Sequence, residues 1–240
     1  MARIALVTGG TRGLGRGIAL ALKADGCIVA AVYRGNDEAA EKLQGDHGIR
    51  TYKWDVADFD ACEQGIGQVQ RELGAIEILI NNAGITSDAA LHHMTREQWQ
   101  RVVEINLGSM FNMCRHVIEG MRERNFGRIV NISSINGQKG QFGQVNYAAT
   151  KAGILGFTRA LALESARKNI TVNAIAPGYC DTDMVSAVPP DVLKSIIAGI
   201  PVGRLGAPSD VARTAVFLSK DEAGFITGAT FSINGGQYMG

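Results

Sequence analysis

Short apolar segments alternate with longer amphipathic segments along the 240 residues, and this alternation constrains the fold more than any other feature. The apolar segments are rich in valine and isoleucine and alternate little with polar residues, as strands covered on both faces do. The pattern therefore predicts an α/β fold, a parallel sheet with helices on both faces. We expect strands at Ile4–Thr8, Ile28–Tyr33, Arg50–Trp54, Ile76–Asn81, Gly127–Ile132, Ile170–Ala176 and Phe225–Ile233. We expect helices at Leu14–Asp25, Asp37–His47, Phe59–Leu73, Thr95–Arg124, Tyr147–Arg167 and Ser209–Leu218, and a short one at Val188–Ala198.

The pattern is continuous enough to predict one domain over residues 1–240. No linker rich in proline or serine, internal repeat or low-complexity segment interrupts it. All five prolines follow Ala176, so we expect an irregular insertion at about 180–208, before the last helix and strand. An insertion at this place is a candidate lid over a substrate.

The charge balance and the cysteines argue against several classes of function. Lysine and arginine number 24 against 23 aspartates and glutamates, so we expect neither nucleic acid nor an anionic membrane as a partner. The apolar runs are too short for a signal peptide or a membrane-spanning helix. The cysteines are far apart and form no CxxC pair, which indicates reduced thiols in a cytoplasmic protein and no metal site: Cys27, Cys62, Cys114 and Cys180.

The first predicted strand ends in "TGGTRGLG", a turn suited to a phosphate group. Glycines leave room for the backbone to approach a pyrophosphate, and the following helix points its free N–H groups at that anion. The alternative is a tight strand–helix turn that binds nothing. The predicted cofactor-binding residues here are Gly9, Thr11, Arg12, Gly13, Leu14 and Gly15.

The end of the second predicted strand indicates which dinucleotide binds. An acidic residue there would hold the adenosine ribose of NAD, but this strand runs into Arg34, and no acidic residue appears before Asp37. Arg34 and Arg12 are suited to a 2′-phosphate, so the sequence predicts NADPH rather than NADH. The alternatives are a solvated surface arginine at Arg34 and a helix-entry charge at Arg12.

Two further segments are candidates for the rest of the nucleotide. Asp55 and Val56 follow the third strand, where a carboxylate and an apolar side chain can bracket an adenine ring. The alternative for Asp55 is a helix cap. The segment "NNAG" follows the fourth strand at the central crevice, where such sheets bind ligands, and contributes Asn82, Ala83 and Gly84.

These motifs resemble the short-chain dehydrogenases/reductases over essentially the whole chain. The resemblance implies a Rossmann-type, doubly wound parallel sheet with strand order 3-2-1-4-5-6-7, usually in a homotetramer. Within the family, "NISSINGQKGQFGQ" and "PGYCDTDM" are most similar to reductases of acetoacetyl-CoA that feed polyhydroxybutyrate synthesis. The matching motifs are Thr8-Gly9-x-x-x-Gly13-x-Gly15, Asn81-Asn82-Ala83-Gly84, Ser134, Tyr147-x-x-x-Lys151 and Pro177-Gly178.

Tyr147 and Lys151 are four residues apart, so a helix starting near Asn146 would place both on one face. A phenol has a pKa of about 10 in water, and a neighbouring ammonium is expected to lower that pKa. Tyr147 would then serve as a general acid or base. The alternative for the pair is an exposed contact along a helix.

The other catalytic candidates come from the strand and helix before Tyr147. Ser134 follows the fifth strand and would hydrogen-bond the substrate carbonyl, whereas the adjacent Ser133 should point elsewhere. The resemblance implies that Asn106 holds a water near Lys151; the alternative is an amide at a helix kink. A serine nucleophile is disfavoured because Ser134 lies in no Gly-x-Ser-x-Gly turn.

The resemblance also implies the reaction. It is hydride transfer from NADPH to acetoacetyl-CoA, which gives (R)-3-hydroxybutyryl-CoA. It further implies that Lys151 binds the nicotinamide ribose, that Thr182 holds the carboxamide, and that Pro177 and Gly178 shape the same pocket. Candidates for the thioester substrate are Gln141, Phe142, Gln144 and Tyr179, with a polar loop surface as the alternative reading.

Two other functions stay open at this point. A 3-oxoacyl-[acyl-carrier-protein] reductase would need a basic docking surface, and one could form from Arg122, Arg124, Arg128, Arg167 and Lys168. A nucleotide sensor without catalysis would need the glycine turn but neither the tyrosine nor the lysine.

Overall fold

The computed structural model describes residues 2–182, 185 and 189–240. Seven parallel strands form one sheet in the order β3-β2-β1-β4-β5-β6-β7, which confirms the expected topology. Ligand sites in such sheets lie outside the carboxyl ends of the strands, where the order reverses between β1 and β4. The strands are β1 (Ile4–Thr8), β2 (Ile28–Tyr33), β3 (Arg50–Lys53), β4 (Ile76–Asn81), β5 (Gly127–Ile132), β6 (Ile170–Pro177) and β7 (Thr230–Ile233).

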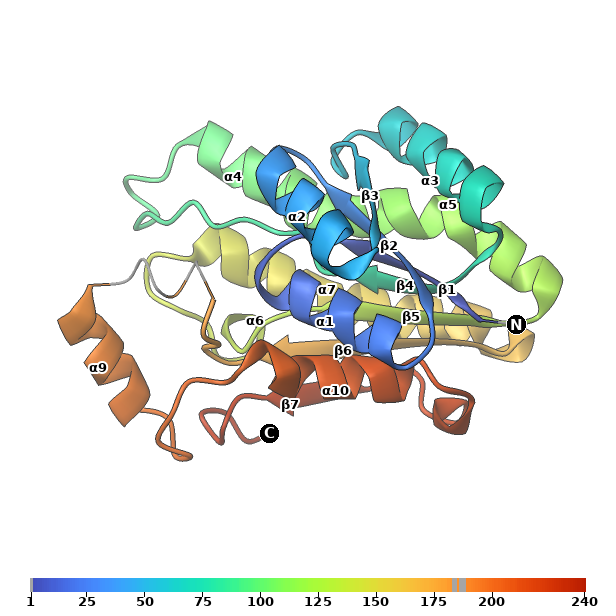
Figure 1. Ribbon diagram of the computed structural model, residues 1–240. Coiled ribbons are helices and arrows are strands. Elements are labelled where there is room, and N and C mark those ends of the chain that lie inside the picture. The colour runs from blue at the N-terminus through green and yellow to red at the C-terminus, as the bar shows by residue number, and fades with distance from the viewer. Residues whose placement is uncertain (1, 183–184, 186–188) are drawn as a thin grey trace.

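Helices cover both faces of this sheet (Figure 1). Along β1, Ile4 and Leu6 belong to one apolar cluster, whereas Ala5 and Val7 belong to the other. Both clusters are buried, which explains why the strands read as continuous apolar runs. One face carries α1 (Gly13–Ala24), α2 (Asp37–His47) and α10 (Pro208–Leu218). The other carries α3 (Phe59–Leu73), α5 (Ser109–Arg124) and α7 (Val145–Ser165).

The segment expected as one helix over Thr95–Arg124 is divided. It consists of α4 (Arg96–Val103), a π-helical turn η1 (Glu104–Gly108) and α5. Thr95 and Gln98 form a capping box at the start of α4. The π turn contains Asn106, whose side chain bonds the backbone of a distant loop, and such turns occur often at functional sites.

The chain end also differs from the expectation. The predicted strand Phe225–Ile233 shortens to β7, because Thr227 and Gly228 instead bond the edge of β6 through Val172. The end of the helix predicted to Arg167 is a separate 3-10 turn, η2 (Ala166–Lys168), and short elements that the sequence pattern missed are α6 (Asn136–Lys139) and η3 (Asp221–Ala223). The helix expected at Val188–Ala198 is α9 (Pro190–Ala198), and Val188 itself lies outside the described residues.

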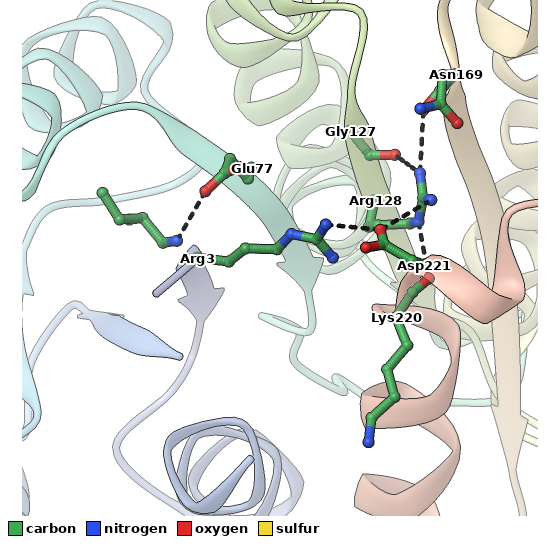
Figure 2. A network of polar contacts seen from close by, with 8 residues as sticks. Arg3, Glu77, Gly127, Arg128, Asn169, Lys220 and Asp221 are labelled. Carbon is green, nitrogen blue, oxygen red and sulfur yellow. Dashed lines mark hydrogen bonds and ion pairs between the residues drawn. The ribbon is translucent and has the colours of Figure 1, made fainter. Parts of the chain in front are cut away.

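A buried arginine holds the amino edge of the sheet together (Figure 2). Arg128 is only 2% exposed. Its guanidinium donates to the carbonyl oxygens of Gly127, Asn169 and Lys220 at 2.8, 3.0 and 3.1 Å. Asp221 lies 3.8 Å away and supplies the opposing charge. This network joins β5 to the segments that precede β6 and follow α10.

Within the described residues, no helix is long and apolar enough to cross a membrane.

Candidate active site

The glycine turn lies between β1 and α1 and has the backbone that a phosphate cradle needs. Gly9 and Gly13 have φ angles of +60° and +51°, a region that favours glycine. At the start of α1, the side chain of Arg12 makes no capping hydrogen bond. The first N–H groups of the helix thus lack a side-chain cap and are suited to an anionic ligand.

The three glycines of this turn serve different purposes. A Cβ at Gly15 would collide with the carbonyl oxygen of Gly9, so Gly15 lets the helix close against the turn. A Cβ at Gly9 would lie 3.1 Å from the amide nitrogen of Asn82. At Gly13 the nearest atom would be the methyl of Thr182, at 3.7 Å, which places Thr182 above the turn. A dinucleotide phosphate fits this arrangement.

Thr8 joins the ends of β1 and β4, a role that the sequence analysis missed. Its Oγ1 accepts from the backbone N–H groups of Asn82 and Ala83 at 2.9 and 3.0 Å. The side chain of Asn82 in turn donates to the carbonyl oxygens of Thr8 and Gly9 at 2.9 and 3.3 Å. Asn82 therefore shapes the glycine turn. A hydroxyl residue at the end of the first strand was the available signal.

Arg34 and Asp55, predicted separately for the nucleotide, are brought together. Arg34 Nε lies 3.0 Å from Asp55 Oδ2, and the arginine side chain remains more than half exposed. Asp55 does not cap α3; Asp58 does, through the N–H of Ala61. The helix-cap alternative for Asp55 is therefore wrong. Val56 is buried in the core.

Tyr147 and Lys151 project from the first turns of α7, which begins at Val145, before the predicted helix start at Tyr147. The ammonium of Lys151 lies 5.6 Å from the centre of the Tyr147 ring. Lys151 is buried and donates to the carbonyl oxygen of Ile132 at 2.8 Å. The pair therefore faces the end of β5, not solvent as an exposed helix contact would.

Burial moves the pKa values of the two side chains in opposite directions. Desolvation raises the pKa of the Tyr147 phenol, a hydrogen bond with Ser134 lowers it, and the charges of Asp88 and Tyr179 raise it. The expected lowering of the Tyr147 pKa by Lys151 is therefore wrong. Desolvation instead lowers the pKa of Lys151 to about 8, because its ammonium has left water.

Ser134 is nearly buried at the end of β5. Its Oγ accepts from the backbone N–H of Asn136 at 3.1 Å. The hydroxyl hydrogen of Ser134 takes no part in this bond and remains available as a donor to Tyr147, with which Ser134 shares a hydrogen bond. Ser133 turns away and donates to the carbonyl oxygen of Lys151 at 2.7 Å, as expected.

Asn106 bonds the backbone of Ile85 through both the oxygen and the nitrogen of its side-chain amide. Its Oδ1 accepts from Ile85 N at 2.8 Å, and its Nδ2 donates to Ile85 O at 2.9 Å. A Cβ at Gly84 would lie 3.3 Å from Asn106 Oδ1 and 3.6 Å from Lys151 Nζ. Asn106 therefore lies close to Lys151 with only a glycine between them, and fixes the loop after β4.

The candidate substrate residues differ in exposure and in their contacts. Gln141 is exposed, and Phe142 is 89% exposed. Gln144 instead forms side-chain hydrogen bonds, described below. Tyr179 is partly buried and close enough to Tyr147 to raise the pKa of its phenol.

The turn after β6 sets the position of Tyr179. A Cβ at Gly178 would lie 2.8 Å from the Cα of Asn234, so Pro177 and Gly178 pack directly against the end of β7. A cavity of about 280 Å³ lies beside Tyr179, with Ile200, Val202 and Ile233 among its lining residues. Part of the predicted lid, residues 183–184 and 186–188, is outside the described residues.

The predicted basic docking surface lies at the opposite edge of the sheet. Its five residues precede β5 or β6 or stand near the start of β5, whereas the catalytic candidates follow the strand ends. A strand of six residues such as β5 is ~20 Å long and separates the two edges. Arg128 is buried, and Arg122 and Arg124 donate to carbonyl oxygens. Of the five residues, Arg128 is therefore unavailable for docking, whereas Arg124, Arg167 and Lys168 are exposed at this edge.

Two kinds of comparison agree with this geometry. A family model described as Enoyl-(Acyl carrier protein) reductase matches residues 9–237. The chain belongs to the short-chain dehydrogenase/reductase family. The site and the family together make it an oxidoreductase that uses a nicotinamide cofactor.

Curated relatives extend over the full length. The chain is 61% identical to the acetoacetyl-CoA reductase of Shinella zoogloeoides and 62% identical to that of Rhizobium meliloti, with 100% of each chain covered. It is 41% identical to a 3-oxoacyl-[acyl-carrier-protein] reductase of Vibrio harveyi, over 99% of this chain and 98% of the relative.

Proposed function

We propose that this protein is an NADPH-dependent acetoacetyl-CoA reductase that forms (R)-3-hydroxybutyryl-CoA for polyhydroxybutyrate synthesis. The observation that carries the proposal is the grouping of Ser134, Tyr147 and Lys151 beside an uncapped helix N-terminus. Relatives named acetoacetyl-CoA reductase at 61–62% identity support the substrate. The (R) configuration follows from the family resemblance alone.

The side chains divide the chemistry of ketone reduction. The bound dinucleotide supplies the hydride. Ser134 donates a hydrogen bond to the substrate carbonyl and stabilises the negative charge that develops on its oxygen. Tyr147 donates the proton, and its raised pKa keeps the phenol protonated before transfer. Lys151, with a pKa of about 8, returns a proton to Tyr147 near neutral pH.

Preference for NADPH is supported by Arg34 at the end of β2 and by the exposed Arg12 in the glycine turn. Asp55 beside Arg34 orients the guanidinium and lowers the net positive charge there. The ratio of kcat/KM for NADPH and NADH tests the preference. A ratio above about ten, or roughly 1.4 kcal/mol, is expected. A preference for NADH would contradict it.

An acyl-carrier-protein substrate is the second candidate. The 41% identity to a carrier-protein reductase, against 61–62% for the acetoacetyl-CoA reductases, argues against this candidate. The retained tyrosine and lysine disfavour a sensor without catalysis.

Four subunits are proposed for the assembled enzyme. We propose α4, α5 and α7 as interfaces, because each carries an exposed apolar side chain: Trp99, Phe111 and Leu163. Light scattering coupled to gel filtration measures the mass, which we expect to be four times 25.5 kDa. We further propose that residues 1–240 form one domain with a lid at about 180–208. We also propose that the protein is cytoplasmic, a compartment in which its four free thiols stay reduced.

Consumption of NADPH by the purified protein in the presence of acetoacetyl-CoA tests the proposed function directly. We expect saturable turnover and chiral analysis that identifies the (R) product. Binding of NADPH without turnover of acetoacetyl-CoA would contradict the proposal and favour the sensor reading.

A further inference from the structure

Two loops beside Tyr147 are joined by three hydrogen bonds. The first loop follows β4, and the second leads into α7. Ala89 N donates to Gly143 O at 2.9 Å, and Asn146 Nδ2 donates to Ser87 O at 3.0 Å. The third bond joins two side chains, Gln144 Nε2 and Asp88 Oδ2, at 2.7 Å. Its acceptor is a carboxylate, and hydrogen bonds to charged groups are the stronger class.

Gln144 continues this contact toward the catalytic serine. Its Oε1 accepts from Asn136 Nδ2 at 2.9 Å. Asn136 is only 7% exposed, and its backbone N–H donates to Ser134 Oγ. A chain of hydrogen bonds thus runs from Asp88 through Gln144 and Asn136 to Ser134. Both the oxygen and the nitrogen of the Gln144 amide thus bond other side chains of the protein. The sequence predicted Gln144 only as a substrate ligand, without these partners.

The segment 140–144 has little else to hold it. Gly140 and Gly143 have φ angles of +76° and +78°, and a Cβ at either would meet no atom within 4 Å. Between them Phe142 is 89% exposed. Because glycines permit many backbone conformations, hydrogen bonds from outside the segment must select one of them.

We infer that Asp88 is a positioning residue for the substrate: it holds Gln144, and through Gln144 it fixes the segment 140–144 beside Ser134. The inference rests on the proposed function, because acetoacetyl-CoA is the substrate whose binding it governs. Asp88 acts through Gln144 and is assigned no contact with the reacting atoms.

Exchanging the carboxylate and the amide tests this pairing. In Gln144→Glu, two carboxylates face each other, so we expect the KM for acetoacetyl-CoA to rise by about tenfold or more. Adding Asp88→Asn gives an amide at position 88 that can donate to the new carboxylate at position 144. Asn136 can still donate to that carboxylate. The double variant should recover most of the lost affinity, with a larger effect on KM than on kcat. Asp46→Asn, an exposed site on α2, is the matched control.

The same exchange separates positioning from direct contact. If the amide of Gln144 donated to the substrate itself, the double variant would still present a carboxylate to the substrate. Its KM would then stay as high as that of Gln144→Glu, and the inference would be overturned.

Proteolysis gives a second readout that needs no substrate. Chymotrypsin cleaves after exposed aromatic residues, and Phe142 stands in the tethered segment while Phe225 is fully exposed elsewhere. We expect Gln144→Glu to accelerate cleavage after Phe142 relative to Phe225, and the double variant to restore the ratio. Equal ratios in all variants would overturn the tether. If the ratio changes as expected but acetoacetyl-CoA is not reduced by the wild type, the proposed function fails and the tether stands.

Discussion

At the scale of single residues, burial sets the proton chemistry of the site. Burial destabilises the charged form of each group. It therefore raises the pKa of the Tyr147 phenol, which is charged when deprotonated, and lowers the pKa of the Lys151 ammonium, which is charged when protonated. The two pKa values therefore move apart, and the protonated Lys151 becomes the stronger acid of the pair, able to return a proton to the Tyr147 phenolate. The sequence identified both residues by their spacing but gave the wrong sign for Tyr147, since burial depends on the elements packed around it.

Tyr147→Phe removes the proton donor while keeping the ring. We expect kcat for acetoacetyl-CoA to fall by about 10³-fold, within the range of general acid catalysis. Fluorescence titration should find the affinity for NADPH little changed, because the phenyl ring still packs at the start of α7. Substantial turnover in this variant would refute the role of Tyr147 as the acid.

The lowered pKa of Lys151 predicts how the rate of reduction depends on pH. Its protonated form returns the proton, and that form is lost as pH rises through about 8. We therefore expect kcat for reduction to be constant below pH 7 and to fall as pH rises through 8. In Lys151→Arg the guanidinium stays charged, so the residual activity should lack this decline. A wild-type kcat that is flat up to pH 9.5 would contradict the assignment.

At the scale of elements, the site is the meeting point of strand ends and helix starts. The turns after β1 and β4 are joined through Thr8 and Asn82, and the end of β5 lies against α7 through Lys151. Gly15 lets the start of α1 pack against the turn after β1, because a side chain at this position would collide with the carbonyl oxygen of Gly9. The cofactor site therefore depends on backbone packing as well as on side chains.

Gly15→Ala tests this packing. Its methyl group would displace the glycine turn, so we expect the affinity for NADPH to fall by about tenfold or more, together with a loss of ~1–3 kcal/mol in stability. Gly45→Ala in α2 is the control, since a Cβ there meets no atom within 4 Å and alanine favours a helix. Unchanged NADPH affinity in Gly15→Ala, measured by fluorescence titration, would contradict the account.

Sequence patterns predicted the elements well where the pattern itself carries the information. Apolar runs such as Ile4–Thr8 and Gly127–Ile132 gave the strand bounds as the structure has them, because burial on both faces needs a continuous run. The π turn around Asn106 was not predicted, since the apolar pattern is that of one helix and Asn106 bonds Ile85, which is distant in sequence. The tether between Asp88 and Gln144 was not predicted either, because these residues are also far apart in the sequence.

At the scale of the whole molecule, the two edges of the sheet have separate roles. The carboxyl edge gathers the candidate catalytic residues, and the amino edge is held by Arg128 and its carbonyl partners (Figure 2). The sequence offered Arg128 as part of a basic docking surface, but sequence alone does not reveal that its guanidinium is buried. Burial lowers the pKa of Arg128, and Asp221 opposes that shift.

Arg128→Met should therefore affect stability and spare the chemistry. Three carbonyl oxygens lose their donor, so we expect a loss of ~2–4 kcal/mol in the free energy of unfolding. The variant that folds should keep its kcat, because the amino edge is a strand length away from Tyr147. Urea unfolding with parallel assays measures both, and Lys168→Met, an exposed cation at the same edge, is the control. A large loss of kcat without a loss of stability would contradict this division.

The central claim is that the site takes a coenzyme A thioester. Its most direct test compares kcat/KM with NADPH on acetoacetyl-CoA and on the acetoacetyl thioester of an acyl carrier protein, under the same conditions. We expect the coenzyme A thioester to be preferred by at least about tenfold, or ~1.4 kcal/mol in transition-state stabilisation. A preference for the carrier-protein thioester would contradict the claim and make the protein a 3-oxoacyl-[acyl-carrier-protein] reductase.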